Sequence, residues 1–239
     1  MKSLFASALV ALGIMSGAPV SAASFSVVGA PTGIDPTTLP IDFGRLRDAA
    51  GVFTLATRGL PIFGPLFDDD GKLNTSAPVE TFDSTNIAAQ GLAISSARQI
   101  KATYLGFEAT NTNTADATVV LDSGTAFSTA TSLLGDTFRF TVPAGPSPLL
   151  VPLAFDTTGQ GGNTKVAVNG ATISTGLLLA FTEIFNGGRS VIAMLGDIDA
   201  DRDIDDIVVR LDVVPLPAAV WMLLAAVGGL GFMGRRRTA

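Results

Sequence analysis

The 239-residue chain contains no cysteine and no histidine. Without cysteine there is no disulfide framework, no thiol nucleophile and no thiolate metal site. Without histidine the chain lacks the side chain that most often performs acid–base catalysis near neutral pH. A Ser-His-Asp triad and a zinc hydrolase site are therefore excluded, and we do not expect an enzyme.

Basic residues are scarce in the central part of the chain. Lys2, Arg235, Arg236 and Arg237 belong to the two ends, whereas all 21 Asp and Glu residues lie between Asp35 and Asp212. The central part keeps 11 of the 15 Lys and Arg residues, so its net charge is −10. Such a surface repels nucleic-acid phosphates and anionic lipid headgroups, and the charge balance indicates neither as a partner.

The N-terminus has the features of a secretory signal peptide. Lys2 precedes a short apolar run, Leu4–Met15, and small residues follow it, including Ser21-Ala22-Ala23. A positive start, an apolar core of about a dozen residues and an A-x-A-like exit are typical of a peptide cleaved here after Ala22 or Ala23. An uncleaved anchor is the weaker alternative, because the run is too short to span a bilayer comfortably. We therefore predict a signal peptide over residues 1–23.

The last segment of the chain, residues 213–239, predicts a membrane-spanning helix. No charged residue occurs from Val213 to Gly234, and Arg235, Arg236 and Arg237 follow at once. Roughly 20 uncharged residues are enough to cross a bilayer, and the positive-inside rule places the arginines in the cytoplasm and the body outside. Trp221 stands near the outer end, where an indole favours the interface. A buried core helix competes poorly with these features.

A proline-containing motif stands just before this helix. In Val214-Pro215-Leu216-Pro217-Ala218, two prolines within three residues neither continue a strand nor begin inside a helix. We expect the segment to be extended and accessible, as a processing enzyme requires. The motif, the apolar helix and the terminal arginine cluster resemble the VPLPA-CTERM sorting tail, a variant of the PEP-CTERM signal of Gram-negative bacteria.

That resemblance covers about the last 26 residues. It implies that a membrane-embedded exosortase, a cysteine protease-transpeptidase, recognises Pro215, Leu216, Pro217 and Ala218 and removes the helix. The chain is then the substrate of that enzyme. The resemblance implies an inner-membrane location with the body in the periplasm before processing, and the cell surface or extracellular matrix afterwards, with exopolysaccharide as a further partner.

Residues 24–212 have the pattern of an all-β body. Runs of alternating or β-branched residues recur between turn signals such as Asn186-Gly187-Gly188. About nine short strands at this spacing predict an antiparallel β-sandwich, jelly-roll-like in topology, and no fixed period supports a repeat array. The predicted strands are Ser24–Val28, Val52–Thr57, Ile100–Ala109, Thr137–Val142, Leu149–Phe155, Thr164–Val168, Gly176–Phe185, Ser190–Leu195 and Asp206–Val213.

Three further segments carry weaker patterns. Thr110–Thr131, dense in Thr, Ser and Asn, predicts a pair of polar edge strands, with a flexible or O-glycosylated segment as the alternative. Gly59–Pro65 predicts a loop held by apolar contacts. A short helix is predicted near Pro40–Ala50, where Phe43 and Leu46 stand at helical spacing.

Six aspartates gather just before the last predicted strand. On a straight strand, alternate carboxylates would line one face about 6–7 Å apart and repel one another. A loop brings their oxygens together, and Ca²⁺ takes about six to eight oxygen ligands. A solvated acidic turn, in which Asp side chains cap backbone amides, explains the pattern equally well. The predicted calcium ligands are Asp197, Asp199, Asp201, Asp203 and Asp206.

This acidic segment is not an EF-hand, because Arg202 stands at the glycine position and Val208 at the closing glutamate position. It resembles the Gly-Asp-x-Asp-x-x-Asp-(Leu/Ile/Val)-Val-Val motif that often precedes such sorting tails in secreted β-sandwich proteins, with Asp201, Asp203 and Asp206 matching. A second cluster, Asp68–Asn74, has Leu66 where the first ligand is expected, and a surface turn is the favoured interpretation.

The sequence thus predicts a non-enzymatic structural protein of the cell surface or extracellular matrix. The alternative is a calcium-dependent adhesin or a carbohydrate-binding β-sandwich, although one Tyr and one Trp provide few aromatic platforms. An enzyme would need two carboxylates across a cleft, and nothing in the sequence places Glu80, Glu108 or Glu183 in that way.

Overall fold

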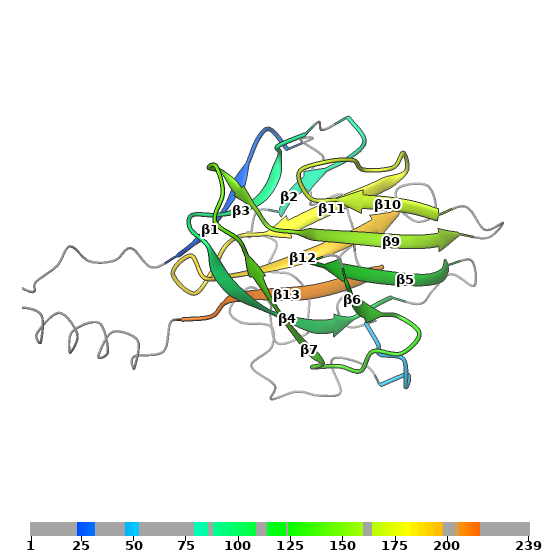
Figure 1. Cartoon of the computed structure of the whole chain (residues 1–239). Coiled ribbons are helices and arrows are strands. Elements are labelled where there is room, and N and C mark those ends of the chain that lie inside the picture. Colours follow the sequence, from blue (N-terminus) through cyan, green and yellow to red (C-terminus); the bar gives the residue numbers. More distant parts are fainter. Residues whose placement is uncertain are drawn as a thin grey trace, which may run out of the picture.

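A computed structural model of the chain describes residues 23–31, 46–52, 79–85, 88–108, 114–122, 124–159, 164–197, 204 and 206–215. These residues form thirteen β-strands and contain no helix, so the all-β prediction is confirmed (Figure 1). The strands are β1 Phe25–Val28, β2 Val79–Phe82, β3 Gly91–Ile94, β4 Arg98–Gly106, β5 Thr114–Leu121, β6 Gly124–Ser128, β7 Thr137–Val142, β8 Leu149–Leu150, β9 Leu153–Gly159, β10 Thr164–Val168, β11 Leu177–Thr182, β12 Ser190–Asp197 and β13 Ile207–Val213.

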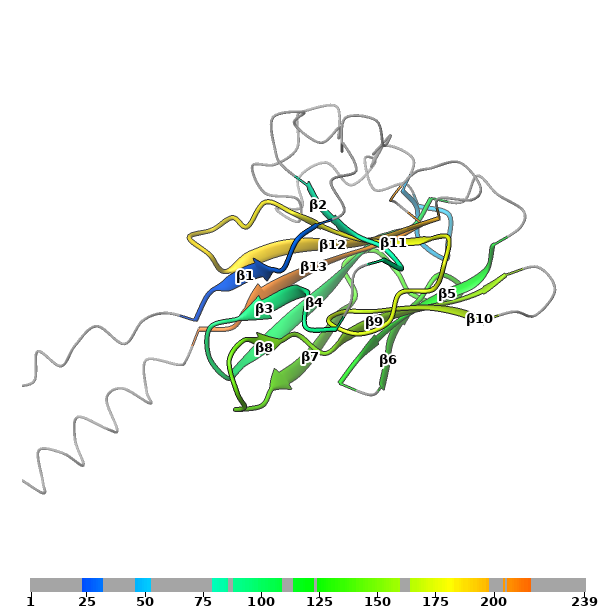
Figure 2. The ribbon, with the colours of Figure 1, turned by 90° about the horizontal axis from the view of Figure 1, so that it is seen from above.

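The strands pair into three antiparallel sheets that pack together in a β-sandwich-like arrangement (Figure 2). The largest sheet has the order β2-β11-β12-β13-β4-β7, the second β10-β9-β5-β6, and the third β1-β3-β8. One apolar core joins all three sheets, with Leu92 from the third sheet, Phe155 from the second and Val209 from the first. Removal of these apolar faces from water is the main force that holds the sheets together.

β11, an inner strand of the largest sheet, explains why parts of the sequence do not alternate. Every residue of β11 is buried, so Leu177, Leu179 and Phe181 face the shared core while Leu178 and Ala180 are buried on the opposite face. Strands buried on both faces are continuous apolar runs, because neither face selects polar side chains. β7, an edge strand, instead alternates exposed and buried positions.

Most predicted strands occur, and two match to the residue, namely Thr137–Val142 and Thr164–Val168. The predicted strand Leu149–Phe155 is divided into β8 and β9 at Pro152. Proline has no backbone N–H for a sheet ladder, and the chain changes sheets at this point. β8 pairs with β3 in the third sheet, whereas β9 pairs with β5 in the second.

Other predictions differ from the structure. The segment Thr110–Thr131 does contain two strands, but β5 lies between β9 and β6 and is not at an edge, because Val119 and Leu121 are buried in the core. β2 and β3, of four residues each, were not predicted, because neither alternates buried and exposed positions. The short helix near Pro40–Ala50 is absent from the described residues 46–50, where Arg47 forms a β-bridge with Phe107. Residues 53–57 and 59–65 lie outside the described residues.

Both ends of the described chain leave the body beside one hairpin loop, residues 183–189, which joins β11 to β12. The Phe25 N–H donates to the Gly188 carbonyl oxygen at 2.7 Å, and the Val213 N–H donates to the Arg189 carbonyl oxygen at 2.8 Å. The start of β1 and the end of β13 therefore lie at the same end of the sheets (Figure 1). We call this the tail end of the body.

Candidate functional site

The predicted sorting motif begins directly where the last strand ends. Val213 is buried, the Val214 N–H donates to the Gln99 carbonyl oxygen at 2.9 Å, and Pro215 is exposed. β13 lies between β12 and β4, and Pro215, which has no N–H, cannot extend its ladder. The motif therefore follows a central strand without any spacer. Leu216, Pro217, Ala218 and the arginines Arg235, Arg236 and Arg237 lie outside the described residues.

A side-chain network braces the end of β13. Asp212 Oδ1 accepts hydrogen bonds from Arg210 Nη2 at 2.8 Å, from Arg210 Nε at 3.0 Å and from Ser190 Oγ at 2.6 Å. The Arg210 guanidinium also lies 5.3 Å from the centroid of the Phe185 ring. These contacts tie β13 to β12 and to the hairpin loop, so the strand is held firmly up to the last residue before the motif.

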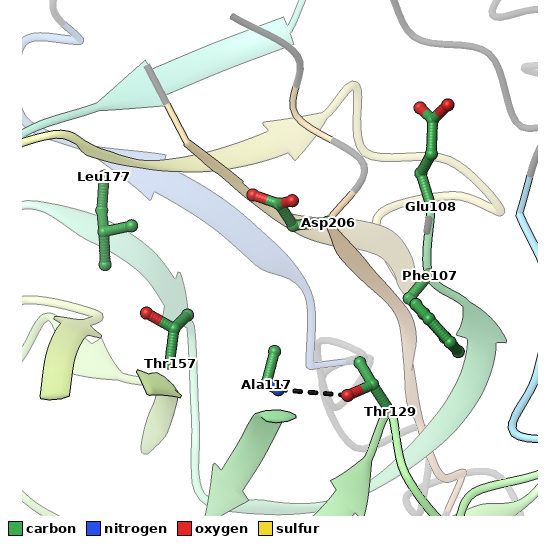
Figure 3. A pocket seen from close by; sticks show the side chains of 7 residues that line it. All are labelled: Phe107, Glu108, Ala117, Thr129, Thr157, Leu177 and Asp206. Carbon is green, nitrogen blue, oxygen red and sulfur yellow. Dashed lines mark hydrogen bonds between the residues drawn. The ribbon is translucent and has the colours of Figure 1, made fainter. Parts of the chain in front are cut away.

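A pocket opens at the opposite end of the body, which we call the acidic end (Figure 3). It encloses about 400 Å³, including the part open to solvent. Two sheets meet around it. The largest sheet contributes the ends of β4, β11 and β13, and the second sheet contributes β5, β9 and the end of β6. The lining residues are Phe107, Glu108, Ala117, Thr129, Thr157, Leu177 and Asp206.

The pocket combines an apolar surface with oxygen groups. Phe107, Ala117 and Leu177 supply the apolar part, and the Thr129 hydroxyl accepts a hydrogen bond from the Ala117 N–H at 3.1 Å. Glu108 is only 8% exposed, and Asp206 is partly buried. In Figure 3 the Glu108 carboxylate points away from Asp206, so the two do not converge on one point between them. Carboxylate and hydroxyl oxygens are the donors that hard cations prefer.

The structure places one end of the predicted calcium segment at this pocket, because Asp206 lines it. Asp197 is the last residue of β12 and Asp206 immediately precedes β13, and the two strands pair antiparallel through Leu195 and Ile207. Asp199, Asp201, Asp203 and Asp205 lie outside the described residues, as does the second cluster, Asp68–Asn74. Within the part of the chain that the structure describes, no three Asp or Glu side chains are placed to hold a metal ion. The calcium site therefore stays a prediction.

Glu108 is a pocket residue that the sequence pattern did not single out. It lies two residues beyond Gly106, the last residue of β4, and Gly106 pairs with Val208 of β13. Its proximity to Asp206 therefore results from the pairing of two strands about 100 residues apart. No local sequence signal reports such a pairing.

Tyr104, the single tyrosine of the chain, is a second unexpected feature of this end. Its side chain is fully buried, and its ring centroid lies 5.6 Å from that of Phe127. Its hydroxyl has no hydrogen-bond partner among the residues that the structure describes. Burial raises the pKa of Tyr104 well above its usual value, and the nearby carboxylates of Asp48 and Asp136 raise it further. The phenol therefore stays protonated throughout the physiological pH range.

Asp48 has a structural role next to this tyrosine. Its Oδ1 accepts hydrogen bonds from the N–H groups of Ala50 and Val52, both at 2.9 Å, and its Oδ2 accepts one from the Leu134 N–H at 3.2 Å. These bonds explain why a charged side chain with 5% exposure is tolerated here.

Among the described residues there is no helix long and apolar enough to cross a membrane. The predicted span lies outside them from Leu216 onward.

Comparison with known protein families and with curated proteins gives no match to this chain. The interpretation of both ends of the body therefore depends on their own geometry.

Proposed function

We propose that this chain is an exported structural protein of the cell surface or extracellular matrix, which an exosortase-like enzyme processes at its C-terminal tail. In this proposal the body, a jelly-roll-like β-sandwich, stands in the periplasm while residues 216–239 hold it in the inner membrane. The main supporting observation is the position of Pro215, exposed and directly after the buried, hydrogen-bonded Val213.

The shared exit of the two chain ends supports the same topology. A signal peptide before Ala23 and a membrane tail after Pro215 both require the membrane to lie next to the tail end of the body. Phe25 and Val213 are bound to neighbouring carbonyls of one loop, so both requirements are met by one orientation. A body with its ends at opposite sides would need a long linker to achieve this.

The burial of Ala23 distinguishes between the two predicted signal-peptide cleavage sites. Ala23 is 3% exposed and belongs to the apolar core. Cleavage after Ala22 keeps this core residue in the mature protein, whereas cleavage after Ala23 removes it. We therefore propose cleavage after Ala22, with Ser24 held by a hydrogen bond from its N–H to Ser95 Oγ at 3.0 Å.

Mass spectrometry of the mature protein from cells with and without the sorting enzyme tests this function. We expect a mature protein that begins at Ala23 and ends before the arginine cluster, and full C-termini in cells that lack the enzyme. The variant Pro215→Ala plus Pro217→Ala should keep its C-terminus even when the enzyme is present. Pro146→Ala, an exposed proline at the same end of the body, is the matched control. An intact Ala239 in cells with the enzyme would contradict the proposal.

A second candidate function, cation-dependent binding, is favoured by one observation. Asp206 of the aspartate-rich segment lines the same pocket as the buried Glu108. We propose calcium as the cation, because the available donors are oxygens. A calcium-dependent adhesin is the corresponding function, with exopolysaccharide as a partner outside the cell.

A further inference from the structure

Four cations surround the point where the chain leaves the body. The Arg189 carbonyl oxygen accepts from the Val213 N–H, and the Gln99 carbonyl oxygen accepts from the Val214 N–H. On β4, Arg98 precedes Gln99 and Lys101 lies two residues beyond it. Arg139 on β7 is the register partner of Lys101. Arg139 and Arg189 are exposed, and Arg98 and Lys101 are partly exposed. We refer to Arg98, Lys101, Arg139 and Arg189 as the exit cations.

The exit cations keep most of their hydrogen-bonding capacity for a partner. Arg98 Nη1 donates to the Ala97 carbonyl at 3.2 Å, Arg139 Nη1 to Gln99 Oε1 at 3.3 Å and Arg189 Nε to the Asn186 carbonyl at 3.2 Å. All three acceptors are neutral. Asp212 of β13 is the register partner of Lys101, and its ion pair is with Arg210.

The acids of the described body gather mainly at the other end. The acids at the acidic end include Asp48, Glu108, Asp136 and Asp206, and the basic residues there include Arg47 and Lys165. At the tail end, Glu183 is exposed in the hairpin loop and Glu80 is partly exposed on the edge strand β2. Among the described residues, the exit cations therefore outnumber the acids at that end that are not already paired. The described part of the tail end is accordingly more positive than the described part of the acidic end, whereas the net charge of −10 counts all of residues 24–212.

From this arrangement we infer that the tail end of the body docks on the anionic phospholipid headgroups of the membrane that holds its tail. The inference rests on the proposed function for the membrane tail alone and does not require processing. With no spacer after Val213, a membrane segment that begins near Pro215 holds the exit cations close to the lipid phosphates. Lys101 lies two residues beyond Gln99, which is about 7 Å along β4. This distance is shorter than the roughly 10 Å over which salt screens charges, so Lys101 still interacts with lipid phosphates near the exit.

Lipid phosphates suit these side chains because guanidinium groups bind phosphate oxygens with paired N–H donors. Each cation close to an anionic membrane surface strengthens association about five-fold. The carboxylates at the acidic end are repelled by the same surface. Both effects favour an orientation in which the tail end contacts the membrane and the pocket faces away from it.

A single fluorophore on the full-length chain, reconstituted in vesicles that carry a lipid-bound quencher, tests this inference. Since the chain has no cysteine, Ala144→Cys places one label at the exposed β7–β8 connection of the tail end, and Leu133→Cys places one at the acidic end. We expect the Ala144 label to be quenched more in phosphatidylcholine mixed with phosphatidylglycerol than in phosphatidylcholine alone. The Leu133 label should be insensitive to this change.

Two charge variants separate a local effect from net charge. Arg189→Gln and Lys165→Gln each remove one positive charge, but only Arg189 is an exit cation. Arg189→Gln should lower the ratio of docked to undocked orientations about five-fold, while Lys165→Gln should leave it unchanged.

Equal quenching of the Ala144 label in both lipids, with the chain inserted, would overturn the inference and leave the proposed function intact. Failure of the full-length chain to float with either vesicle would contradict the membrane tail itself, and the inference would fall with it.

Discussion

The backbone N–H of Val213 donates a 2.8 Å hydrogen bond to the carbonyl oxygen of Arg189. Next to it, the Gly188 carbonyl accepts from the Phe25 N–H, so two consecutive residues of one hairpin loop hold the first and the last strand of the body. The loop therefore determines the relative position of the two chain ends. Any change in this loop should affect both ends together.

Gly188→Ala should destabilise the body more than Gly187→Ala. Both glycines have positive φ, +89° and +65°, where an alanine is strained by about 1–2 kcal/mol. A Cβ at Gly188 would also lie 2.9 Å from Ser24 Cβ, whereas nothing lies within 4 Å of one at Gly187. Urea unfolding should show the larger loss for Gly188→Ala, by about 1 kcal/mol. Equal losses would show that the contact with Ser24 carries no energy.

Asn169→Ala should be strongly destabilising. The buried Asn169 accepts from the Leu92 N–H at 2.7 Å and donates to the carbonyl oxygens of Leu92 and Val151, both at 2.8 Å. It thereby connects the third sheet to the loop after β10. Its loss leaves the Leu92 N–H without this partner, whereas the carbonyl oxygens of Leu92 and Val151 still accept from the N–H groups of Val151 and Leu153. We expect a loss of about 1–3 kcal/mol in the free energy of unfolding. The control Thr141→Ala, at an exposed position of β7, should change this energy by less than about 0.5 kcal/mol.

Tyr104→Phe should keep or raise stability at neutral pH. The hydroxyl is buried with no hydrogen-bond partner in the described part of the chain, and removal of an unsatisfied polar group recovers its desolvation cost of about 1–3 kcal/mol. The ring contact with Phe127 is retained. Thermal unfolding of both proteins measures the difference. A clear loss of stability would mean that the hydroxyl has a partner in solution.

The same residue makes the stability of the protein sensitive to alkaline pH. The folded pKa of Tyr104 is raised above the unfolded value of 10.0, so the folded state retains the proton longer. The contribution of this raised pKa to the free energy of unfolding is complete below pH 10 and decreases as the pH rises above that value. Stability measured from pH 9 to pH 11 should fall more steeply for the native protein than for Tyr104→Phe. Tyrosinate absorbance, from this one residue, should appear only with unfolding.

Calcium should raise the melting temperature if the aspartate-rich segment binds it. At a calcium concentration of about 100 Kd the folded state is stabilised by about 2.7 kcal/mol. For a domain of this size, each kcal/mol raises the melting temperature by roughly 2–4 °C. Asp201→Ala plus Asp203→Ala should abolish the rise, and Glu108→Gln should reduce it if the pocket takes part. Asp156→Asn, at a partly buried acid on β9, is the control for Glu108→Gln, because each variant removes one negative charge. An unchanged melting temperature of the native protein in millimolar calcium would exclude the site.

Local patterns carried the predictions that the structure confirms. Alternation of apolar and polar residues depends only on neighbouring positions, and it located most strands, including β7 and β10 without error. The two missed strands, β2 and β3, do not alternate, because β2 is buried at three of its four positions and β3 at all four. The break at Pro152 was also local, since proline lacks a donor, but the change of sheet that accompanies it was not.

The sequence by itself determined the all-β class, the exclusion of histidine and cysteine chemistry, and the end of β13 before Pro215. Each of these follows from residue type or short-range spacing. Only the tertiary structure decided that Glu108 and Asp206 line one pocket, that one loop holds Phe25 and Val213, and that the exit cations lie near the chain exit. These depend on which strands pair across long sequence separations, which is set by the burial of shared apolar faces. Net charge is a sum over the chain, whereas electrostatic attraction depends on which charges lie within about 10 Å of one another.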